Sequence, residues 1–518
     1  MSTASRLISG SMASWAQIAV NMAAQLVLVP IYLSYWNVET YGVWLAILGI
    51  MSILSMLDYG YQTYVGYEFL RIGAKNLPSL TKSMWSSVIF GALIGIFQLV
   101  LIGVFIFTNA IPFLLGEDKG GDPALIHGAG IALLLQGITW LFVNTIPGLM
   151  VRALAVFGYF HRTAWWSFAY AILAAVGPLI AVVMGADLLG ASIVLAVCAN
   201  GYGIALYFQL FRWLKLEGVK LMKPSLIIGF NNLKLSLPLL GKSILENVRQ
   251  QGVRLLLAPI AGATGLAAFS TMRTGANVAL QGLNTIVNPL VPDLMRFLHD
   301  RDQARSEAAF ATVWIVVVAF LAPGIVILQA LIEPLYLFWT QGKIAFNPLL
   351  FATLSLGVLI YAVIQPAMAV VIGNNLTKVQ LWLAALGAVL VFVILGVLVP
   401  IIGILGAGIS LLVAEIATAI GYKIYAQKWL NENNLLWPRK AFLLALISVL
   451  MSTVSLAGLV WFPQWKWLIL GVSLIFFLWN LIRYLKCLPS VALENAYRIS
   501  SKIPGIGVIA GKLVRLLQ

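Results

Sequence analysis

Long apolar stretches follow one another along almost the whole chain, and only short polar segments separate them. A membrane-spanning helix needs roughly 20 mostly apolar residues. Fourteen stretches meet this requirement, at 11–33, 41–62, 84–109, 125–148, 163–184, 188–211, 235–258, 265–290, 308–330, 347–371, 379–400, 404–426, 441–461 and 467–486. The pattern predicts an all-α integral membrane protein of about 14 transmembrane helices.

Composition supports the membrane assignment, because 61% of the residues are hydrophobic and only 9% are charged. So few polar residues cannot cover a water-soluble core of this size. The net charge of +15 is a topology signal: with a cytoplasmic N-terminus, 25 of the 32 basic residues fall in inside segments and three in outside loops. The positive-inside rule then places both termini on the cytoplasmic side of the membrane, and nucleic-acid binding is not needed to explain the charge.

An internal repeat divides most of the chain into two copies. "LGASIVLAV" at 189–197 matches "LGAGISLLV" at 405–413, and Pro30 and Pro259 occupy similar runs near the starts of the copies. Each copy has six helices, so both start from the cytoplasm and form parallel repeats. We predict an N-lobe at 1–233 with its basic inside loop, a C-lobe at 234–440, two extra helices within 441–486, and an amphipathic tail at 487–518 on the anionic inner membrane surface.

Polar residues recur at helical spacing within four of the predicted spans. In 265–290 they are spaced four, four and three residues apart, which confines them to one face of the helix. Similar stripes in the spans that open each copy predict a water-filled substrate cavity between the lobes. The stripe residues are Gln17, Asn21, Gln25, Asp58, Lys242, Glu246, Arg249, Arg254, Arg273, Asn277, Gln281 and Asn284.

The charged members of these stripes predict the kind of substrate. A charge in the middle of a membrane costs about 2.5–3.5 kcal/mol, so it normally faces a cavity or a partner. Four of these residues are basic and only Glu246 is acidic, which leaves a surplus of three positive charges and favours an anionic substrate. Two structural alternatives stay open: the charges form a purely structural network, and the Asn and Gln side chains bond neighbouring helices.

Glu415 lies alone in the middle of the span at 404–426. It is a candidate proton or sodium site for coupling transport to an ion gradient. The alternative is a buried acid that bonds a neighbouring helix.

The run "PIYLSYWNVETYGVWLAILGIMSILSMLDYG", with Pro30, Tyr41-Gly42, Trp44 and Asp58-Tyr59-Gly60, resembles the amino-terminal signature of the polysaccharide-transporter family. These are Wzx-type O-antigen flippases of the multidrug/oligosaccharidyl-lipid/polysaccharide (MOP) exporter superfamily. The resemblance implies a bilobed bundle that moves undecaprenyl-pyrophosphate-linked oligosaccharide from the inner to the outer leaflet by alternating access. It also implies a cationic central cavity, and a polysaccharide polymerase and chain-length regulator as partners. Here Lys242, Arg249, Arg254 and Arg273 would supply the positive charge.

We find no nucleotide-binding Gly-Lys loop, no His/Cys metal spacing and no Ser-His-Asp set. We therefore expect a transporter rather than an enzyme, with no cofactor and no metal, driven by an ion gradient or the membrane potential. An ion-coupled multidrug exporter of the same superfamily is one alternative. A membrane glycosyltransferase or polymerase that uses the same lipid-linked substrate is another, although the outside loops are short.

Overall fold

The computed structural model describes residues 3–115, 122–299, 301–374 and 376–488, and these residues form helices and short connections without a strand. The helices are α1 (Thr3–Tyr35), α2 (Val38–Leu54), α3 (Met56–Ile72), α4 (Leu77–Phe107), α5 (Ile111–Leu115), α6 (Pro123–Trp140), η1 (Leu141–Thr145), α7 (Ile146–Ala155), α8 (Phe160–Val183), α9 (Leu188–Leu216), α10 (Leu226–His299), α11 (Gln303–Val316), η2 (Val317–Leu321), α12 (Ala322–Trp339), α13 (Pro348–Gly373), α14 (Thr377–Ile402), α15 (Ile404–Glu432), α16 (Arg439–Trp461), η3 (Pro463–Trp465) and α17 (Lys466–Lys486).

Within the described part, twelve continuous helical segments are long and apolar enough to cross a membrane. Each overlaps one predicted span. The other two predicted spans, 235–258 and 265–290, both lie in α10, whose backbone leaves helical geometry at Gly262 (φ 74°, ψ 171°). The fold class is therefore confirmed, and the helix count agrees with the predicted number of about 14.

Asn and Asp residues begin many of these helices. The side chain of Asn37 accepts a hydrogen bond from the Thr40 amide (2.7 Å), and that of Asp187 accepts one from the Gly190 amide (2.7 Å). Asn347 does the same at the start of α13, where its side chain accepts from Leu350 N (3.0 Å). Such caps satisfy amide groups that have no partner within the helix. They explain why short polar segments suffice between the long apolar stretches.

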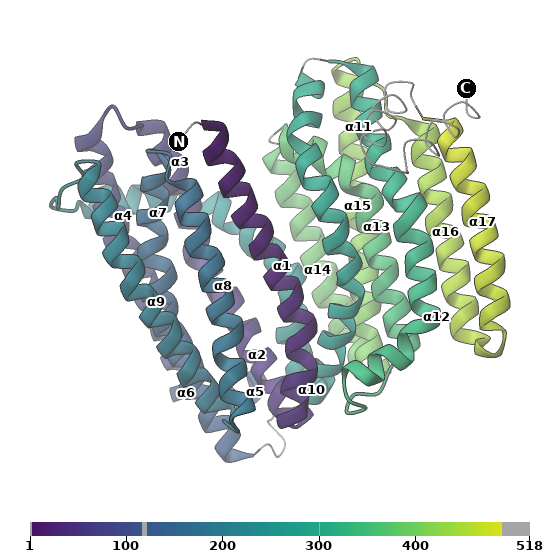
Figure 1. Cartoon of the computed structure of the whole chain (residues 1–518), viewed down its shortest axis with the longest axis horizontal. Coiled ribbons are helices and arrows are strands. Elements are labelled where there is room, and N and C mark those ends of the chain that lie inside the picture. Colours follow the sequence, from purple (N-terminus) through teal and green to yellow (C-terminus); the bar gives the residue numbers. More distant parts are fainter. Residues whose placement is uncertain (1–2, 116–121, 300, 375, 489–518) are drawn as a thin grey trace. The chain divides into compact units, whose positions relative to one another are not determined.

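Equivalent helices of the two copies pack in the same way (Figure 1). In the first copy α9 packs against both α6 and α8, and in the second α15 packs against both α13 and α14. The repeated Leu-Gly-Ala segments stand at the starts of α9 and α15. The shared packing supports two six-helix copies related by a parallel repeat, with α16 and α17 added after them.

The added pair, α16 and α17, is joined by buried polar side chains. The Asn480 amide donates to Leu444 O (2.9 Å) and Ser448 Oγ (2.8 Å), and Ser455 and Ser473 share a hydrogen bond of 2.7 Å. The Tyr484 hydroxyl donates to Ala311 O (2.8 Å) and so attaches the pair to α11. In lipid, packing and polar contacts of this kind drive helices together, because the tails are as apolar as the helix surfaces.

The chain divides into two compact units. Unit 1 contains Met1–Thr271 and the segment Trp339–Ile344, and unit 2 contains Met272–Phe338 and Ala345–Gln518. The segment of unit 1 that begins with the last residue of α12 binds α1: the Trp339 indole N–H donates to Leu26 O (2.5 Å), and the Gln341 amide donates to Pro30 O (3.1 Å). The bounds of these units differ from those of the predicted lobes, 1–233 and 234–440. The lobe boundaries stay a prediction.

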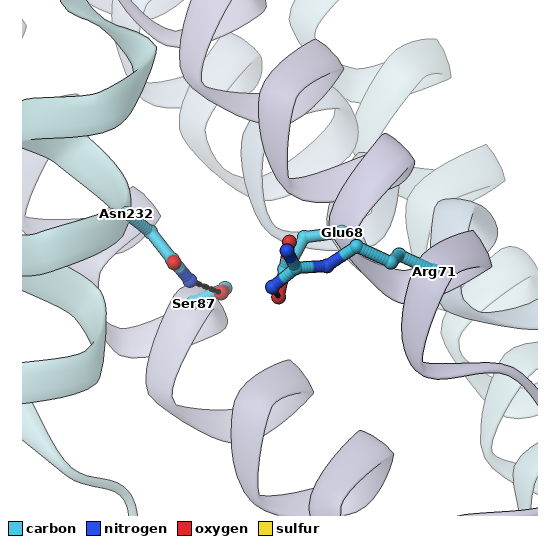
Figure 2. Close-up of polar contacts among 4 residues, drawn as sticks. All are labelled: Glu68, Arg71, Ser87 and Asn232. Carbon is cyan, nitrogen blue, oxygen red and sulfur yellow. Dashed lines mark hydrogen bonds and ion pairs between the residues drawn. The ribbon is translucent and has the colours of Figure 1, made fainter.

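The first part of α10 packs closely on α2, α3 and α4 within unit 1. A Cβ added to Gly42 would lie 2.1 Å from Ala263 O, and one added to Gly60 would lie 2.7 Å from the Leu240 Cα. Only glycine allows backbones to approach so closely. Figure 2 shows a further contact, in which the Asn232 amide of α10 donates to Ser87 Oγ of α4 (3.4 Å).

Candidate functional site

Five of the predicted cavity residues lie in α10, and the structure describes their backbones but not their side chains. Their backbones are helical, and nothing is described of how their side chains lie. The predicted cationic cluster therefore stays a prediction for these positions. They are Lys242, Glu246, Arg249, Gln281 and Asn284.

Arg254 and Arg273 are the two predicted cavity cations whose side chains are described, and both are half-buried. Arg254 packs on α2: a Cβ added to Gly49 would lie 3.6 Å from the Arg254 Cβ. Its Nε is buried and has no hydrogen-bond partner among the described residues. A guanidinium in this position calls for an acceptor or an anion. Asn277, also on α10, is half-buried.

The polar stripe of α1 faces away from the packed interior of unit 1. Asn21 and Gln25 are exposed and Gln17 is half-buried. Amide side chains are unfavourable against lipid tails, so such a stripe indicates contact with water or with a polar partner.

Asp58 lies elsewhere, at the centre of a hydrogen-bond network inside unit 1, and is 0% exposed. Its Oδ2 accepts from the Thr145 hydroxyl (2.5 Å) and from the Gln62 amide (2.9 Å). The Trp140 indole N–H lies 3.3 Å from each carboxylate oxygen. Three donors from α3, α6 and η1 thus hold one buried carboxylate, an arrangement that strongly fixes their positions.

The π-helical turn η1 brings two of these partners to Asp58. It follows Trp140 directly and ends at Thr145. The Gln62 amide also reaches the carbonyl of Asn144 in this turn, at 3.5 Å. Single π-turns inside α-helices are frequent at functional sites. Sequence spacing alone does not predict this turn.

Arg152 is a half-buried cation, with a buried Nε, that the sequence analysis assigns to an inside segment. The helix that starts at α6 continues to Ala155, so Arg152 lies within it. A Cβ added to Gly66 would lie 3.1 Å from the Arg152 Cδ, which shows how closely the side chain packs on α3. The guanidinium carbon of Arg152 lies 5.7 Å from the centre of the Tyr59 ring. The sequence does contain a signal for this contact. Small and polar residues recur every fourth position in α3, at Asp58, Gln62 and Gly66, and such a face favours packing against another helix with polar side chains.

A cavity of about 440 Å³ lies within unit 1, between α1, α2, α6, α8 and α9. Its lining contains aromatic rings, amides and hydroxyls but no charged residue. The lining residues are Leu28, Tyr32, Trp44, Leu48, Met51, Ser52, Ser55, Gln136, Thr139, Trp140, Asn144, Tyr170, Ala174, Leu195 and Ala196. None was a predicted cavity residue, because several helices share the lining and each contributes only a few polar residues to it.

A second cavity, of about 380 Å³, lies in unit 2. Arg439 and Lys440 at the start of α16, Glu307 of α11 and Cys487 after α17 contribute to its lining. These residues belong to predicted inside segments or to the inner ends of spans. Glu415, the predicted coupling residue, lies elsewhere in unit 2 and is half-buried in α15.

Polar side chains also pair at the predicted inner end of unit 1. Glu68 and Arg71 of α3 form an ion pair of 2.6 Å (Figure 2). The Tyr159 hydroxyl, between α7 and α8, donates to Glu217 Oε1 (2.8 Å). Burial and this carboxylate raise the pKa of Tyr159 above its ordinary value, so the hydroxyl stays protonated as a donor. Within the described part, no group of three or more His, Cys, Asp or Glu residues could hold a metal ion.

The sequence matches no protein-family model and no curated protein. Solved structures do match. The chain is similar to a lipid II flippase MurJ in an inward closed conformation, with a TM-score of 0.65 and 13% identity over 91% of this chain and 98% of that one. It is also similar to an inward-facing MATE family multidrug resistance transporter of the MOP superfamily, with a TM-score of 0.61 and 14% identity over 81% of this chain and 95% of that one.

A third match is a MOP superfamily transporter from Pyrococcus furiosus described as having a binding pocket of reverse polarity. Its TM-score is 0.55, with 14% identity over 83% of this chain and 96% of that one. At such low identity the likeness concerns the fold. The chain thus has the multi-pass membrane fold of MOP-superfamily transporters, and these structural neighbours are transporters and flippases rather than enzymes.

Proposed function

We propose that this protein is a flippase that moves undecaprenyl-pyrophosphate-linked oligosaccharide, an O-antigen or polysaccharide repeat unit, from the inner to the outer leaflet of the bacterial cytoplasmic membrane. The observation that carries the proposal is the surplus of positive charge in the spans of α10. These spans contain four basic residues, Lys242, Arg249, Arg254 and Arg273, and one acidic residue, Glu246. The Nε of Arg254, which is buried and has no hydrogen-bond partner among the described residues, supports an anionic ligand. The fold shared with a lipid II flippase is consistent with a lipid-linked substrate.

An ion-coupled multidrug exporter is the second candidate, because MATE transporters share the fold. A site for organic cations favours acidic and aromatic groups over surplus positive charge. We propose that the chain is not an enzyme, and that its product passes to a polysaccharide polymerase and chain-length regulator.

Reconstitution tests the choice between these candidates. Fluorescent undecaprenyl-pyrophosphate-linked oligosaccharide is placed in proteoliposomes, and its appearance in the opposite leaflet is followed under imposed proton, sodium and voltage gradients. We expect gradient-dependent translocation of the lipid and no transport of ethidium. Transport of ethidium without movement of the lipid would identify an exporter of organic cations instead.

Glu415 is the proposed coupling residue, and Glu415→Gln tests it in the same proteoliposomes. Glutamine keeps the size of the side chain but cannot carry a proton or pair with a cation as a carboxylate does. We expect the rate of gradient-driven translocation to fall about tenfold or more, with substrate binding nearly unchanged. A variant that responds to every gradient as the parent does would exclude the coupling role.

Orientation is proposed from the charge distribution, with both termini and the tail at 487–518 on the cytoplasmic side. Residues 489–518 of this tail lie outside the described residues. Single cysteines near Asn76, Lys223 and Gln303 should be shielded from an impermeant thiol reagent in intact cells, and cysteines near Glu117 and Phe346 should react. Permeabilised cells, in which all five sites should react, provide the control. Labelling of the first three sites in intact cells would show that the proposed orientation is wrong.

A further inference from the structure

The cavity inside unit 1 has the size and the walls of a small-ligand site. Its volume of about 440 Å³ lies within the range of ligand pockets, roughly 300–1,000 Å³. Helices α1, α2, α6, α8 and α9 all contribute to it, and Leu48, which is 36% exposed, marks where the lining reaches the surface. The proposed role of α10 does not use this cavity.

Its walls combine aromatic rings with uncharged polar groups. Tyr32, Trp44, Trp140 and Tyr170 supply rings, and Gln136 and Asn144 supply amides. The hydroxyl of Thr139 accepts a hydrogen bond from the Asn200 amide (3.0 Å), and Ser55 donates to Ser52 O (2.8 Å), so these hydroxyls already have partners in the protein. The two amides differ from them.

The amide nitrogen of Gln136 is buried without a hydrogen-bond partner in the described part of the chain, and that of Asn144 is buried with only a loose contact to the hydroxyl of Tyr170, which also lines the cavity. An amide NH₂ group is a donor only, and burying it unpaired is unfavourable. Both groups therefore call for an acceptor oxygen. An organic cation offers positive charge to rings but no acceptor to these two donors.

A phosphate would supply acceptors but meets the wrong charge. Trp140, which lines the cavity, also binds the buried carboxylate of Asp58 at 3.3 Å. An anion placed against this wall would approach the negative charge of Asp58. The described lining residues include no cation that would compensate this repulsion. The hydrogen bond to Asp58 also holds the Trp140 ring in position, so the wall is preformed.

A neutral ligand with acceptor oxygens and apolar ring faces fits all these features. Sugars have both, because hydroxyl and ring oxygens accept hydrogen bonds and the C–H faces of the ring stack on aromatic side chains. We propose that the unit 1 cavity binds a sugar ring of the oligosaccharide, through the amides of Gln136 and Asn144 and the surrounding rings. This inference rests on the proposed flippase function and assigns sugar recognition to a site distinct from the positive charges of α10.

The test compares two ligands on purified full-length protein. One is the lipid-linked oligosaccharide extracted from the cells of origin, and the other is undecaprenyl diphosphate without sugar. Gln136→Met and Asn144→Leu remove an amide with little change in side-chain size. We expect each variant to raise the Kd for the glycosylated lipid about tenfold, and to leave the Kd for the sugar-free lipid unchanged.

Gln98→Met is the matched control. Gln98 is a buried amide of the same unit that donates to Leu54 O (2.9 Å) and does not line the cavity. It should leave the ratio of the two Kd values at the parent value. Where thermal unfolding shows that an amide variant is not folded, Tyr170→Phe, which removes one hydroxyl from the lining, replaces it with the same expectation in direction.

The outcomes separate this inference from the proposed function. A parent protein that translocates the glycosylated lipid while the variants change neither Kd, or change both equally, would overturn the sugar site and leave the flippase standing. Weaker binding of tetraphenylphosphonium in the variants, with unchanged lipid binding, would assign the cavity to organic cations and overturn the inference. A parent that neither binds nor moves the glycosylated lipid would refute the flippase function, and the sugar site with it.

Discussion

Arg249→Ala is expected to abolish transport of the lipid-linked oligosaccharide, in a complementation assay in which the variant reaches the membrane at the level of the parent. If Arg249 binds a pyrophosphate, both its permanent charge and its fork of donors contribute. Arg249→Lys keeps the charge but loses the bidentate geometry, so we expect partial activity. Arg249→Glu should be inactive, because it adds negative charge to the path of an anion.

The double variant of Arg249→Ala and Glu246→Ala separates substrate binding from charge pairing. These residues are three positions apart on one helix and can pair. Were Arg249 present only to neutralise Glu246, removal of both charges would leave no unpaired buried charge, and activity would return. Inactivity of a well-expressed double variant supports a pathway that needs the cation. Full rescue would refute the contact with substrate.

Asp58→Ala is expected to cause the largest loss of stability, about 3 kcal/mol or more. The substitution removes the common acceptor of Thr145, Gln62 and Trp140, and it leaves Gln62 only its long contact with Asn144 O. Thermal unfolding of the purified protein, followed by tryptophan fluorescence, measures the effect. Asp58→Asn should be intermediate, because its carbonyl oxygen can still accept but its NH₂ group faces other donors.

Glu68→Ala is the matched control on the same helix. Its ion pair with Arg71 involves an arginine side chain that is 79% exposed, and exposed pairs contribute at most about 1 kcal/mol. An Asp58→Ala variant that unfolds at the same temperature as Glu68→Ala would show that the donors find other partners. The network would then not stabilise unit 1.

Sequence predicts the spans of this protein well, because the requirement that determines them is local. A helix in lipid must be apolar over its whole length, and it satisfies its backbone hydrogen bonds within itself. Capping residues such as Asn37, Asp187 and Asn347 also act within three residues along the chain. The repeat is readable for a related reason: the Leu-Gly-Ala segments at the starts of α9 and α15 keep the same sequence in both copies.

The stripe residues show the limit of local reasoning. Gln17, Asn21 and Gln25 share one face of α1, and the structure describes that face as half-buried to exposed. Asp58 has the same sequence signature of a polar residue in a span, yet it is fully buried. Spacing along one helix identifies a polar face, but which helix covers that face depends on packing between segments far apart in sequence.

By itself, then, the sequence determined the apolar spans, the repeat and the excess of positive charge, all of which depend on neighbouring residues or on composition. Only the tertiary structure decided two of the three partners of Asp58, which lie 82 and 87 residues further along the chain at Trp140 and Thr145. It also decided the burial of the Arg152 Nε and the cavity that gathers Gln136, Asn144 and Tyr170 from two helical segments. The physical reason is that hydrogen bonds and cavities depend on distances in space, and these distances are established only when the helices pack against one another.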